Sequence, residues 1–401
     1  MGKIDLLKKD GGLAMRRSKI LVGIAVLMLG LVSGCGSTSA PKESAEIKIG
    51  GNLELSGGVA TYGQSVLNSV NLAFDDQNKK GGVLGGKQLK FITADNKSEA
   101  GESTSAITKL ITQDKVVAVL GAVTSSNTKA AVPVSADNKI PLITPTATNS
   151  EVTVNKDGSL NKWVFRSCFL DPFQGKVAAN FVMNTLKLKK AAIFIDQKDD
   201  YSKGLAAEFK KVLEGAGGTI TETAQYVGGD KDFKSTLTRI KASNPEIVFV
   251  PGYYNEVGLI IKQARELGIQ VPFVGGDGWD SAKLPELAGP ANLNGTYFVN
   301  HMWADDPATK PFVEAYKAKY NAEPDALAAL GYDAAKMLIA AIEKAGSTDA
   351  NKLRDALENT KDFSGVTGTI TVDPATHNPV KSAVILQMVD GKKTLLTHVN
   401  P

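Results

Sequence analysis

The chain has 401 residues, of which 43% are hydrophobic, 22% charged and 6% aromatic, a composition that excludes collagen-like and disordered proteins. Its formal net charge of +4 belongs to residues 1–34, because the remainder carries 40 basic and 40 acidic residues. That balance removes the argument for a nucleic-acid partner. Three histidines and two cysteines are too few and too scattered for a zinc site or a disulfide framework.

Residues 1–34 have the pattern of an export signal. A basic start at Met15–Lys19 precedes an unbroken run of 13 apolar or glycine residues, Ile20–Val32, which is too short for a permanent transmembrane helix. The following Leu31-Val-Ser-Gly-Cys35 resembles a bacterial lipobox, in which the cysteine is lipidated and becomes the first mature residue. A core cysteine beside an ordinary secretory cleavage site is the alternative interpretation.

The leader therefore predicts where the protein is found. We expect a lipoprotein signal peptide at 1–34, lipidation of Cys35, and a flexible tether at 35–45 that is rich in Gly, Ser and Thr. The protein would be extracytoplasmic and lipid-anchored to the bacterial cell membrane, on its outer face or in the periplasm. Residues 1–14 precede the charged start, so Met15 is a second candidate initiator.

From residue 46 onwards, short apolar runs alternate with amphipathic ones. Runs that are β-branched and apolar on both faces predict buried parallel strands at 47–51, 88–95, 116–121, 140–144, 191–196, 246–250 and 272–276. Apolar stripes predict helices around Val66–Phe74, Leu205–Leu213 and Val257–Leu267. Residues 311–345 have a mostly helical pattern, and 367–373 and 382–390 are strand-like. The alternation occurs twice, before and after about residue 165, which predicts an α/β fold with two lobes built on parallel sheets.

Polar residues follow several of these strands, where open α/β sheets bind ligands. In the first lobe they are hydroxyl groups, namely Ser125, Thr146 and Thr148, with a predicted helix start near Ser125 that suits an anion. In the second lobe they are aromatic side chains and one carboxylate, namely Tyr201, Tyr253 and Asp277. Each residue alone is typical of a helix cap or a turn. Together, at facing sheet edges, they predict a site for a small zwitterion.

Motifs for catalysis are weak in this chain. Gly81–Lys87 has the spacing of a phosphate loop, but Gln88 replaces the required Ser or Thr and a helix precedes it, so we interpret it as a turn. No Gly-x-Ser-x-Gly or His-Glu-x-x-His motif occurs. We interpret His301 as structural or solvent-exposed and Cys168 as a buried, inert thiol. We therefore expect no catalytic residue, no metal site and no cofactor.

Eight segments, in the same order, resemble the branched-chain amino acid binding proteins of ABC importers, the Leu/Ile/Val-binding type of the type I periplasmic-binding fold. They are LSGGVATYGQ (55–64), NKKGGVLGGKQLKF (78–91), ITPTATN (143–149), FRSCFLDPFQG (165–175), DDYSKG (199–204), KDFKSTLTRIKASNPEIVFVPGYYNEVG (231–258), FVGGDGW (273–279) and FSGVTGTITVD (363–373). The resemblance covers nearly all of residues 47–390 and implies two Rossmann-like lobes joined by a three-strand hinge. Its lobes would be 46–170 with 300–370, and 171–299 with 371–401.

The resemblance also assigns roles to the candidate residues. It implies that Ser125, Thr146 and Thr148 hold the ligand's α-carboxylate and that Asp277 holds the ammonium, with a backbone carbonyl near Thr146. Tyr253 would add a hydrogen bond, and the side-chain pocket would be bordered by Tyr62, Tyr201 and, further, Trp279. Two features depart from the family pattern: Asp277 stands where the Leu/Ile/Val-binding protein has Glu, and the first-lobe disulfide is missing.

The resemblance predicts a solute-binding component of an ABC importer that captures a branched-chain or other hydrophobic amino acid between two closing lobes. Its expected partners are that amino acid and the membrane permease and ATPase subunits of the importer, and we expect a monomer. One alternative is a sensor of the same fold for amides, urea or aromatic acids. Another is an extracellular hydrolase, which would turn its ligand over.

Overall fold

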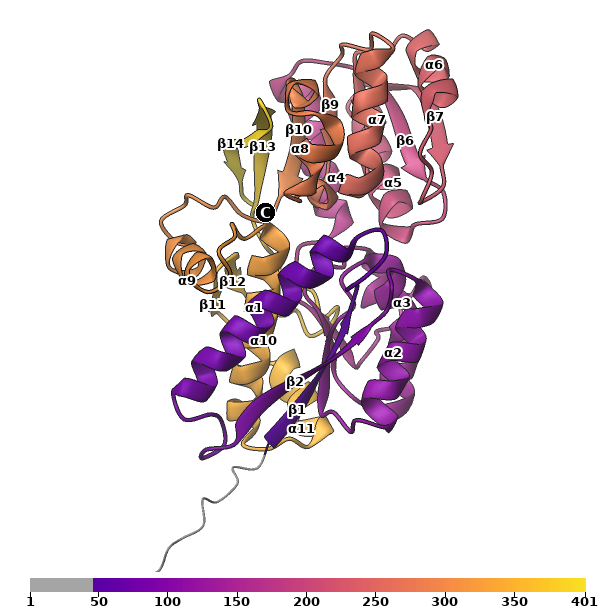
Figure 1. Cartoon of the computed structure of the whole chain (residues 1–401). Coiled ribbons are helices and arrows are strands. Elements are labelled where there is room, and N and C mark those ends of the chain that lie inside the picture. The colour runs from indigo at the N-terminus through magenta and orange to yellow at the C-terminus, as the bar shows by residue number, and fades with distance from the viewer. Residues whose placement is uncertain (1–45) are drawn as a thin grey trace, which may run out of the picture. The chain divides into compact units, whose positions relative to one another are not determined.

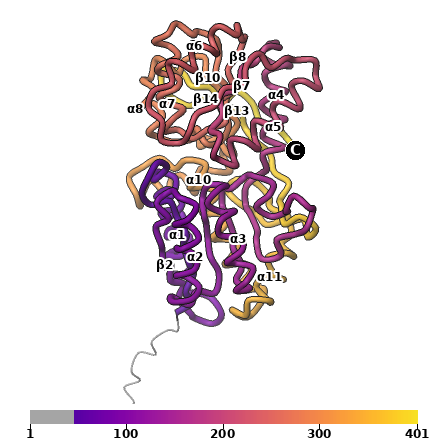
Figure 2. Tube along the Cα trace, turned by 90° about the vertical axis from the view of Figure 1, so that its right-hand side faces the viewer, coloured from indigo at the N-terminus to yellow at the C-terminus, as the bar shows by residue number. Residues whose placement is uncertain are grey.

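The computed structural model describes residues 46–401, so the predicted signal peptide, Cys35 and the tether lie outside the described residues. Within the described part, helices pack on two large sheets (Figure 1). In both views the late helices α10 (Ala326–Ala345) and α11 (Ala350–Glu358) lie beside the first sheet, not the second (Figure 2). The chain therefore builds one lobe, then the other, and returns to the first.

The first sheet has five parallel strands in the order β2-β1-β3-β4-β5. Its strands are β1 (Glu46–Leu53), β2 (Gln88–Asp95), β3 (Ala118–Gly121), β4 (Leu142–Thr144) and β5 (Val164–Arg166). Its helices are α1 (Ala60–Lys79), α2 (Ala100–Thr112), α3 (Ser125–Asn138), α9 (Lys310–Tyr320), α10 and α11. Gly331 lets α10 approach α1 closely, because a Cβ there would lie 2.5 Å from the Ser69 Oγ.

The second sheet has seven strands in the order β14-β13-β10-β9-β8-β6-β7. They are β6 (Lys190–Asp196), β7 (Thr219–Tyr226), β8 (Ile247–Phe249), β9 (Phe273–Gly275), β10 (Thr296–Asn300), β13 (Ala383–Val389) and β14 (Lys392–Val399). Strands β6 to β10 are parallel, whereas β13 and β14 add as an antiparallel edge hairpin. Its helices are α4 (Asp171–Asn180), α5 (Asp200–Gly215), α6 (Lys234–Ala242), α7 (Tyr254–Glu266) and α8 (Lys283–Ala288).

Short elements complete the described chain. They are the hairpin β11 (Phe363–Gly365) and β12 (Gly368–Ile370), the 3₁₀ turns η1 (Ser150–Val152), η3 (Asp277–Trp279) and η4 (Pro290–Leu293), and the π turn η2 (Phe181–Thr185). None of the helices between residues 46 and 401 combines the length and the apolar character needed to cross a membrane. The same residues contain no group of His, Cys, Asp and Glu that could hold a metal ion.

The strands predicted from sequence are confirmed, and three of the strands that were missed share a cause. All seven apolar runs contain a strand of the two sheets, and Gly81–Lys87 is a turn in which Val83 and Lys87 form a bridge. The unpredicted β7 and β14 are edge strands with partly exposed side chains, and β5 has only three residues. Edge and very short strands lack the continuous apolar run that marks a central parallel strand.

The lobe boundaries stay a prediction, and the structure supports moving one of them. Residues after 371 still contact the first lobe: the ring of His377 stacks on Phe165 at 4.2 Å, and its Nδ1 lies 2.9 Å from the Val164 carbonyl oxygen. Asn378 accepts a hydrogen bond from Thr153. We therefore propose that the last crossing to the second lobe follows Lys381, just before β13, and not residue 370.

Candidate functional site

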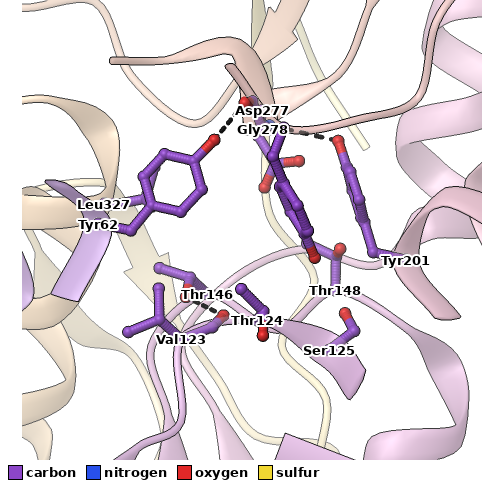
Figure 3. Close-up of a pocket in the computed structure, with 11 residues that line it drawn as sticks. Tyr62, Val123, Thr124, Ser125, Thr146, Thr148, Tyr201, Asp277, Gly278 and Leu327 are labelled. Carbon is purple, nitrogen blue, oxygen red and sulfur yellow. Dashed lines mark hydrogen bonds between the residues drawn. The ribbon is translucent and has the colours of Figure 1, made fainter. Parts of the chain in front are cut away.

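One pocket lies where the carboxyl ends of the two sets of strands face each other. It encloses about 290 Å³ of space between its lining atoms, open solvent included. All seven residues predicted to bind ligand line it, namely Tyr62, Ser125, Thr146, Thr148, Tyr201, Tyr253 and Asp277. The other lining residues are Val123, Thr124, Gly278 and Leu327 (Figure 3). The structure thus brings together residues that are far apart in the sequence.

Two loops of the first lobe form the hydroxyl-bearing wall of the pocket. Ser125 begins α3 directly after β3, so the first N–H groups of that helix, which have no intrahelical partner, lie at this wall. Thr146 Oγ1 donates to the carbonyl oxygen of Val123 at 2.5 Å, and the backbone N–H of Asn149 donates to Ser125 Oγ at 3.3 Å. A helix N-terminus beside hydroxyl groups is a site for an anion.

A buried glutamate holds the first of these loops. Glu54 directly follows β1 and is fully buried, where it accepts hydrogen bonds from the backbone N–H groups of Val123 and Thr124 at 3.1 Å. It also accepts from Asn127 Nδ2 at 2.9 Å. Burial raises the pKa of Glu54, against the effect of these donors. The sequence analysis missed this residue, whose signal is an acidic side chain directly after an apolar strand.

A buried arginine holds the second loop. Arg166, the last residue of β5, is fully buried, and its Nη1 donates to the carbonyl oxygen of Ala147 at 2.6 Å. Its Nη2 donates to the carbonyl oxygen of Asn149 at 2.9 Å. Burial lowers the pKa of this guanidinium. Arg166 thereby fixes the backbone on both sides of Thr148.

Aromatic side chains form the opposite wall. Tyr201 and Tyr253 stack with ring centroids 5.2 Å apart, and Tyr62 meets Tyr253 edge-on at 5.8 Å. Tyr62 donates its hydroxyl to the carbonyl oxygen of Gly278, and the Gly278 N–H donates to the Tyr201 hydroxyl at 3.2 Å, as the dashed lines in Figure 3 show. Burial raises the pKa of all three phenols well above the usual value. They therefore present neutral, largely apolar surface.

Asp277 supplies the negative charge of the pocket. Its Oδ1 accepts from Gln174 Nε2 at 3.0 Å, its Oδ2 lies 2.9 Å from His301 Nε2, and its own N–H donates to Gln174 Oε1 at 3.0 Å. It is only 5% exposed, and no Lys or Arg among residues 46–401 pairs with it. The sequence analysis missed Gln174. Of its two interpretations of His301, structural or solvent-exposed, only the second is excluded, because that side chain is fully buried against Asp277.

The structure also shows where Trp279 and Cys168 lie. Trp279 does not line the pocket; it is fully buried, and its Nε1 donates to the carbonyl oxygen of Val250 at 2.9 Å. Residues 277–279 form a 3₁₀ turn, with about three residues per turn, so Asp277 and Trp279 point in different directions. Cys168 is a buried free thiol, as predicted, and burial raises its pKa to about 12.

Comparison with known proteins places this chain in a family. Residues 46–393 match the family model described as periplasmic binding protein. The chain belongs to the periplasmic binding protein family. The Leu/Ile/Val-binding protein BraC3 of Rhizobium johnstonii is 37% identical over 337 residues, which cover 83% of this chain and 89% of that protein.

Two solved structures resemble this periplasmic binding protein along most of its length. The branched-chain amino acid substrate-binding protein LivJ of Streptococcus pneumoniae, in complex with isoleucine, is 39% identical with a TM-score of 0.83 and covers 89% of this chain and 100% of that one. The leucine-binding protein LivK of Thermotoga maritima is 36% identical with a TM-score of 0.82, covering 88% and 99%. The predicted type I fold is confirmed, and the chain is a solute-binding protein and not an enzyme.

In this periplasmic binding protein the two lobes touch directly beside the pocket. Ser126 Oγ of α3 donates to Asp199 Oδ1 at 2.8 Å and accepts from the N–H of Asp200 at 2.9 Å. Lys129 of α3 pairs with Asp200 at 2.9 Å. Asp199 also caps α5 by accepting from the N–H of Ser202 at 2.9 Å. The described form is therefore one in which the lobes meet.

Asp199→Asn is expected to increase the free energy of unfolding at neutral pH. Burial raises the pKa of Asp199 to about 6, above the ~3.9 of an unfolded chain. The unfolded state therefore loses its proton first, and stability falls as the pH rises from about 4 to about 6. Asparagine keeps the cap without the charge, so the gain should be at most about 3 kcal/mol near pH 7.5 and should vanish near pH 4.

Urea unfolding at both pH values measures this gain, and the adjacent residue is a matched control. Although partial burial acts to raise it, the pKa of Asp200 is lowered by Lys129 and Lys203. Asp200→Asn should therefore lower the free energy of unfolding at neutral pH, whereas Asp199→Asn should raise it. Equal responses of the two variants would contradict the assignment of the Asp199 shift.

Proposed function

We propose that this protein is the extracytoplasmic solute-binding component of an ABC importer and captures a branched-chain amino acid between its lobes. The observation that carries the proposal is the Asp277 carboxylate, buried in the pocket without a Lys or Arg partner among the described residues. It lies across the pocket from the N-terminus of α3. A zwitterion satisfies both ends, because its ammonium compensates Asp277 and its carboxylate suits the helix N-terminus.

The proposed placement of the ligand follows from the walls of the pocket. Its carboxylate accepts from the hydroxyl groups of Ser125 and Thr148 and from the N–H groups at the start of α3, and it lies against Thr146, whose own hydroxyl donates to Val123. Its aliphatic side chain lies among the aromatic rings and Leu327, where apolar area leaves water. The name of the BraC3 relative and the isoleucine in the S. pneumoniae structure support this ligand class.

Urea, amides and aromatic acids fit the same pocket less well. None of them carries an ammonium group, so closure would leave Asp277 buried with an uncompensated charge, a cost of roughly 3–5 kcal/mol for a broken buried pair. A sensor that binds the same amino acid would differ from the importer component only in the protein to which it presents the ligand. Neighbouring permease and ATPase genes would favour the importer, and a neighbouring kinase or chemoreceptor gene would favour the sensor.

Capture works by differential affinity for two arrangements of the lobes. Binding groups come from both lobes, so the ligand makes its full set of contacts only when they meet. It therefore shifts an open–closed equilibrium towards the closed form by its preference for that form. The contacts of Ser126 with Asp199 and of Lys129 with Asp200 also add to the closed form. No bond is made or broken, and the ligand leaves unchanged for a permease.

A ligand panel tests the proposal. We expect leucine, isoleucine or valine to raise the thermal unfolding temperature of the monomer, since a ligand at ~100 times Kd adds about 2.7 kcal/mol. Titration calorimetry should show that 4-methylpentanoate, which lacks the ammonium, and isoamylamine, which lacks the carboxylate, bind poorly. Solution scattering should show compaction with the amino acid. Stabilisation by urea or benzoate, with no response to any amino acid, would overturn the proposal.

We propose in addition that Cys35 carries a lipid anchor. The support is the Leu31–Cys35 motif after an apolar run. A single acyl chain gives only marginal membrane binding, so firm retention needs the multi-chain anchor of bacterial lipoproteins. Cys35→Ala should therefore move the protein from the detergent phase to the aqueous phase in phase partitioning. Equal partitioning of the variant and the wild type would contradict lipid attachment.

A further inference from the structure

His301 stands directly behind the carboxylate of the pocket. It follows β10, at the point where the chain leaves the second sheet, and its side chain is fully buried. The ring stacks on Phe169, with centroids 3.6 Å apart and an interplanar angle of 21°. Its Nε2 lies 2.9 Å from Asp277 Oδ2, whereas its Nδ1 has no hydrogen-bond partner among the described residues.

These contacts determine which ring nitrogen carries the proton. A carboxylate oxygen only accepts, so the hydrogen of the neutral ring is on Nε2 and Nδ1 is bare. A second proton on Nδ1 would be buried without an acceptor, which is costly. Burial lowers the pKa of His301, Asp277 and Asp280 oppose that shift, and the buried ammonium of Lys381 adds to it. At neutral pH the ring is therefore an uncharged donor.

The second donor to Asp277 is uncharged as well. Gln174 gives one amide N–H to Oδ1 and accepts the Asp277 backbone N–H with its oxygen, so it fixes both the side chain and the main chain. Two neutral donors orient a carboxylate without cancelling its charge. The whole negative charge of Asp277 is then available to a cation in the pocket.

We propose that His301 positions Asp277 as a neutral donor and that its protonation at acid pH competes with the ligand's ammonium group. The inference rests on the proposed function, because it takes Asp277 as the ammonium partner. An imidazolium at 2.9 Å would form an ion pair with Asp277, and the arriving ammonium would then meet a carboxylate that is already compensated. Because protonation of His301 and ligand binding oppose each other, ligand binding lowers the pKa of His301. Each unit by which that pKa is lowered corresponds to a tenfold loss of affinity for the ligand at a pH where the ring is protonated.

The test compares L-leucine binding by titration calorimetry near pH 7.5 and near pH 5. We expect the wild type to bind more than about threefold more weakly near pH 5 than near pH 7.5, because the lowered pKa of His301 leaves only part of the rings protonated at the acid pH. His301→Gln keeps an N–H donor that does not titrate, so its affinity for leucine should change less than about threefold between the two pH values. It should still bind leucine more weakly than wild type at neutral pH, because it lacks the ring that stacks on Phe169. His301→Leu removes the donor and should bind more weakly than His301→Gln.

The chain offers a matched control in a second buried histidine. His377 also stacks on a phenylalanine, Phe165, and its Nε2 lies 3.2 Å from Glu358 Oε1, but it does not line the pocket. His377→Gln should keep both the affinity and the pH profile of the wild type. The chain has three histidines, so NMR titration can also follow the His301 ring in the wild type, where leucine should lower its pKa.

Each result decides between the possibilities. A flat pH profile in the wild type, a wild-type profile in His301→Gln, or a His301 pKa that leucine does not lower overturns the inference while leaving amino-acid capture intact. If His301→Gln does not fold, the NMR titration of the wild type remains decisive. Failure of the proposed function looks different, because no amino acid would then bind at either pH.

Discussion

Asp277→Asn is expected to weaken binding of a branched-chain amino acid at least tenfold. A charge-assisted hydrogen bond contributes about 1.5–3 kcal/mol, and a buried ammonium left without its partner costs roughly 3–5 kcal/mol. Even the smaller of these effects exceeds the 1.4 kcal/mol that corresponds to about a factor of ten. Titration calorimetry with leucine measures the loss.

The same variant should still fold, with a modest loss of stability. The asparagine oxygen can accept from Gln174 Nε2, and the new amide N–H₂ would face His301 Nε2. His301 can accept that N–H by moving its own proton to Nδ1, where the proton has no acceptor among the described residues, so the variant should lose about 1–3 kcal/mol of stability. The unliganded melting temperature is therefore the control. If the Asn variant binds leucine as tightly as wild type, Asp277 is only a turn residue.

Glu54→Ala is expected to be the most damaging substitution outside the pocket lining. It removes the acceptor of two buried backbone N–H groups, those of Val123 and Thr124, and of the Asn127 side chain. Each buried donor left without an acceptor costs about 1–3 kcal/mol, so the free energy of unfolding should fall by roughly 3 kcal/mol or more. Val123 and Thr124 line the pocket, so leucine binding should weaken as well.

Glu256→Ala is the matched control for this prediction. Glu256 is a buried glutamate on α7 that accepts from the Gly229 N–H at 2.9 Å and from Asn255 Nδ2 at 2.8 Å, away from the pocket lining. Its removal should also lower stability in urea unfolding, but leucine affinity should stay at the wild-type value. If both variants lose affinity equally, Glu54 acts on global stability and not on the loop that it holds.

The sequence allowed prediction of those site residues that come directly after a strand. Parallel strands place their carboxyl ends at one sheet edge, so Ser125, Thr146 and Asp277 could be assigned to a common region from their positions after strands. Tyr62 was different, because it lies on α1 and only the family resemblance pointed to it. Leu327 has no local signal at all. It lies in the first turn of α10, more than two hundred positions beyond β3, and reaches the pocket only because α10 packs on α1.

The sequence by itself determined the alternation of apolar strands and amphipathic helices, the two α/β lobes and the residue types at their strand ends. Those features depend on local periodicity and on topology, which a linear pattern carries. Only the tertiary structure decided what surrounds the charges: that His301 and Gln174 both donate to Asp277, and that Trp279 points into the core. Such contacts join residues from separate elements, and their energy depends on distance and desolvation, which sequence spacing does not encode.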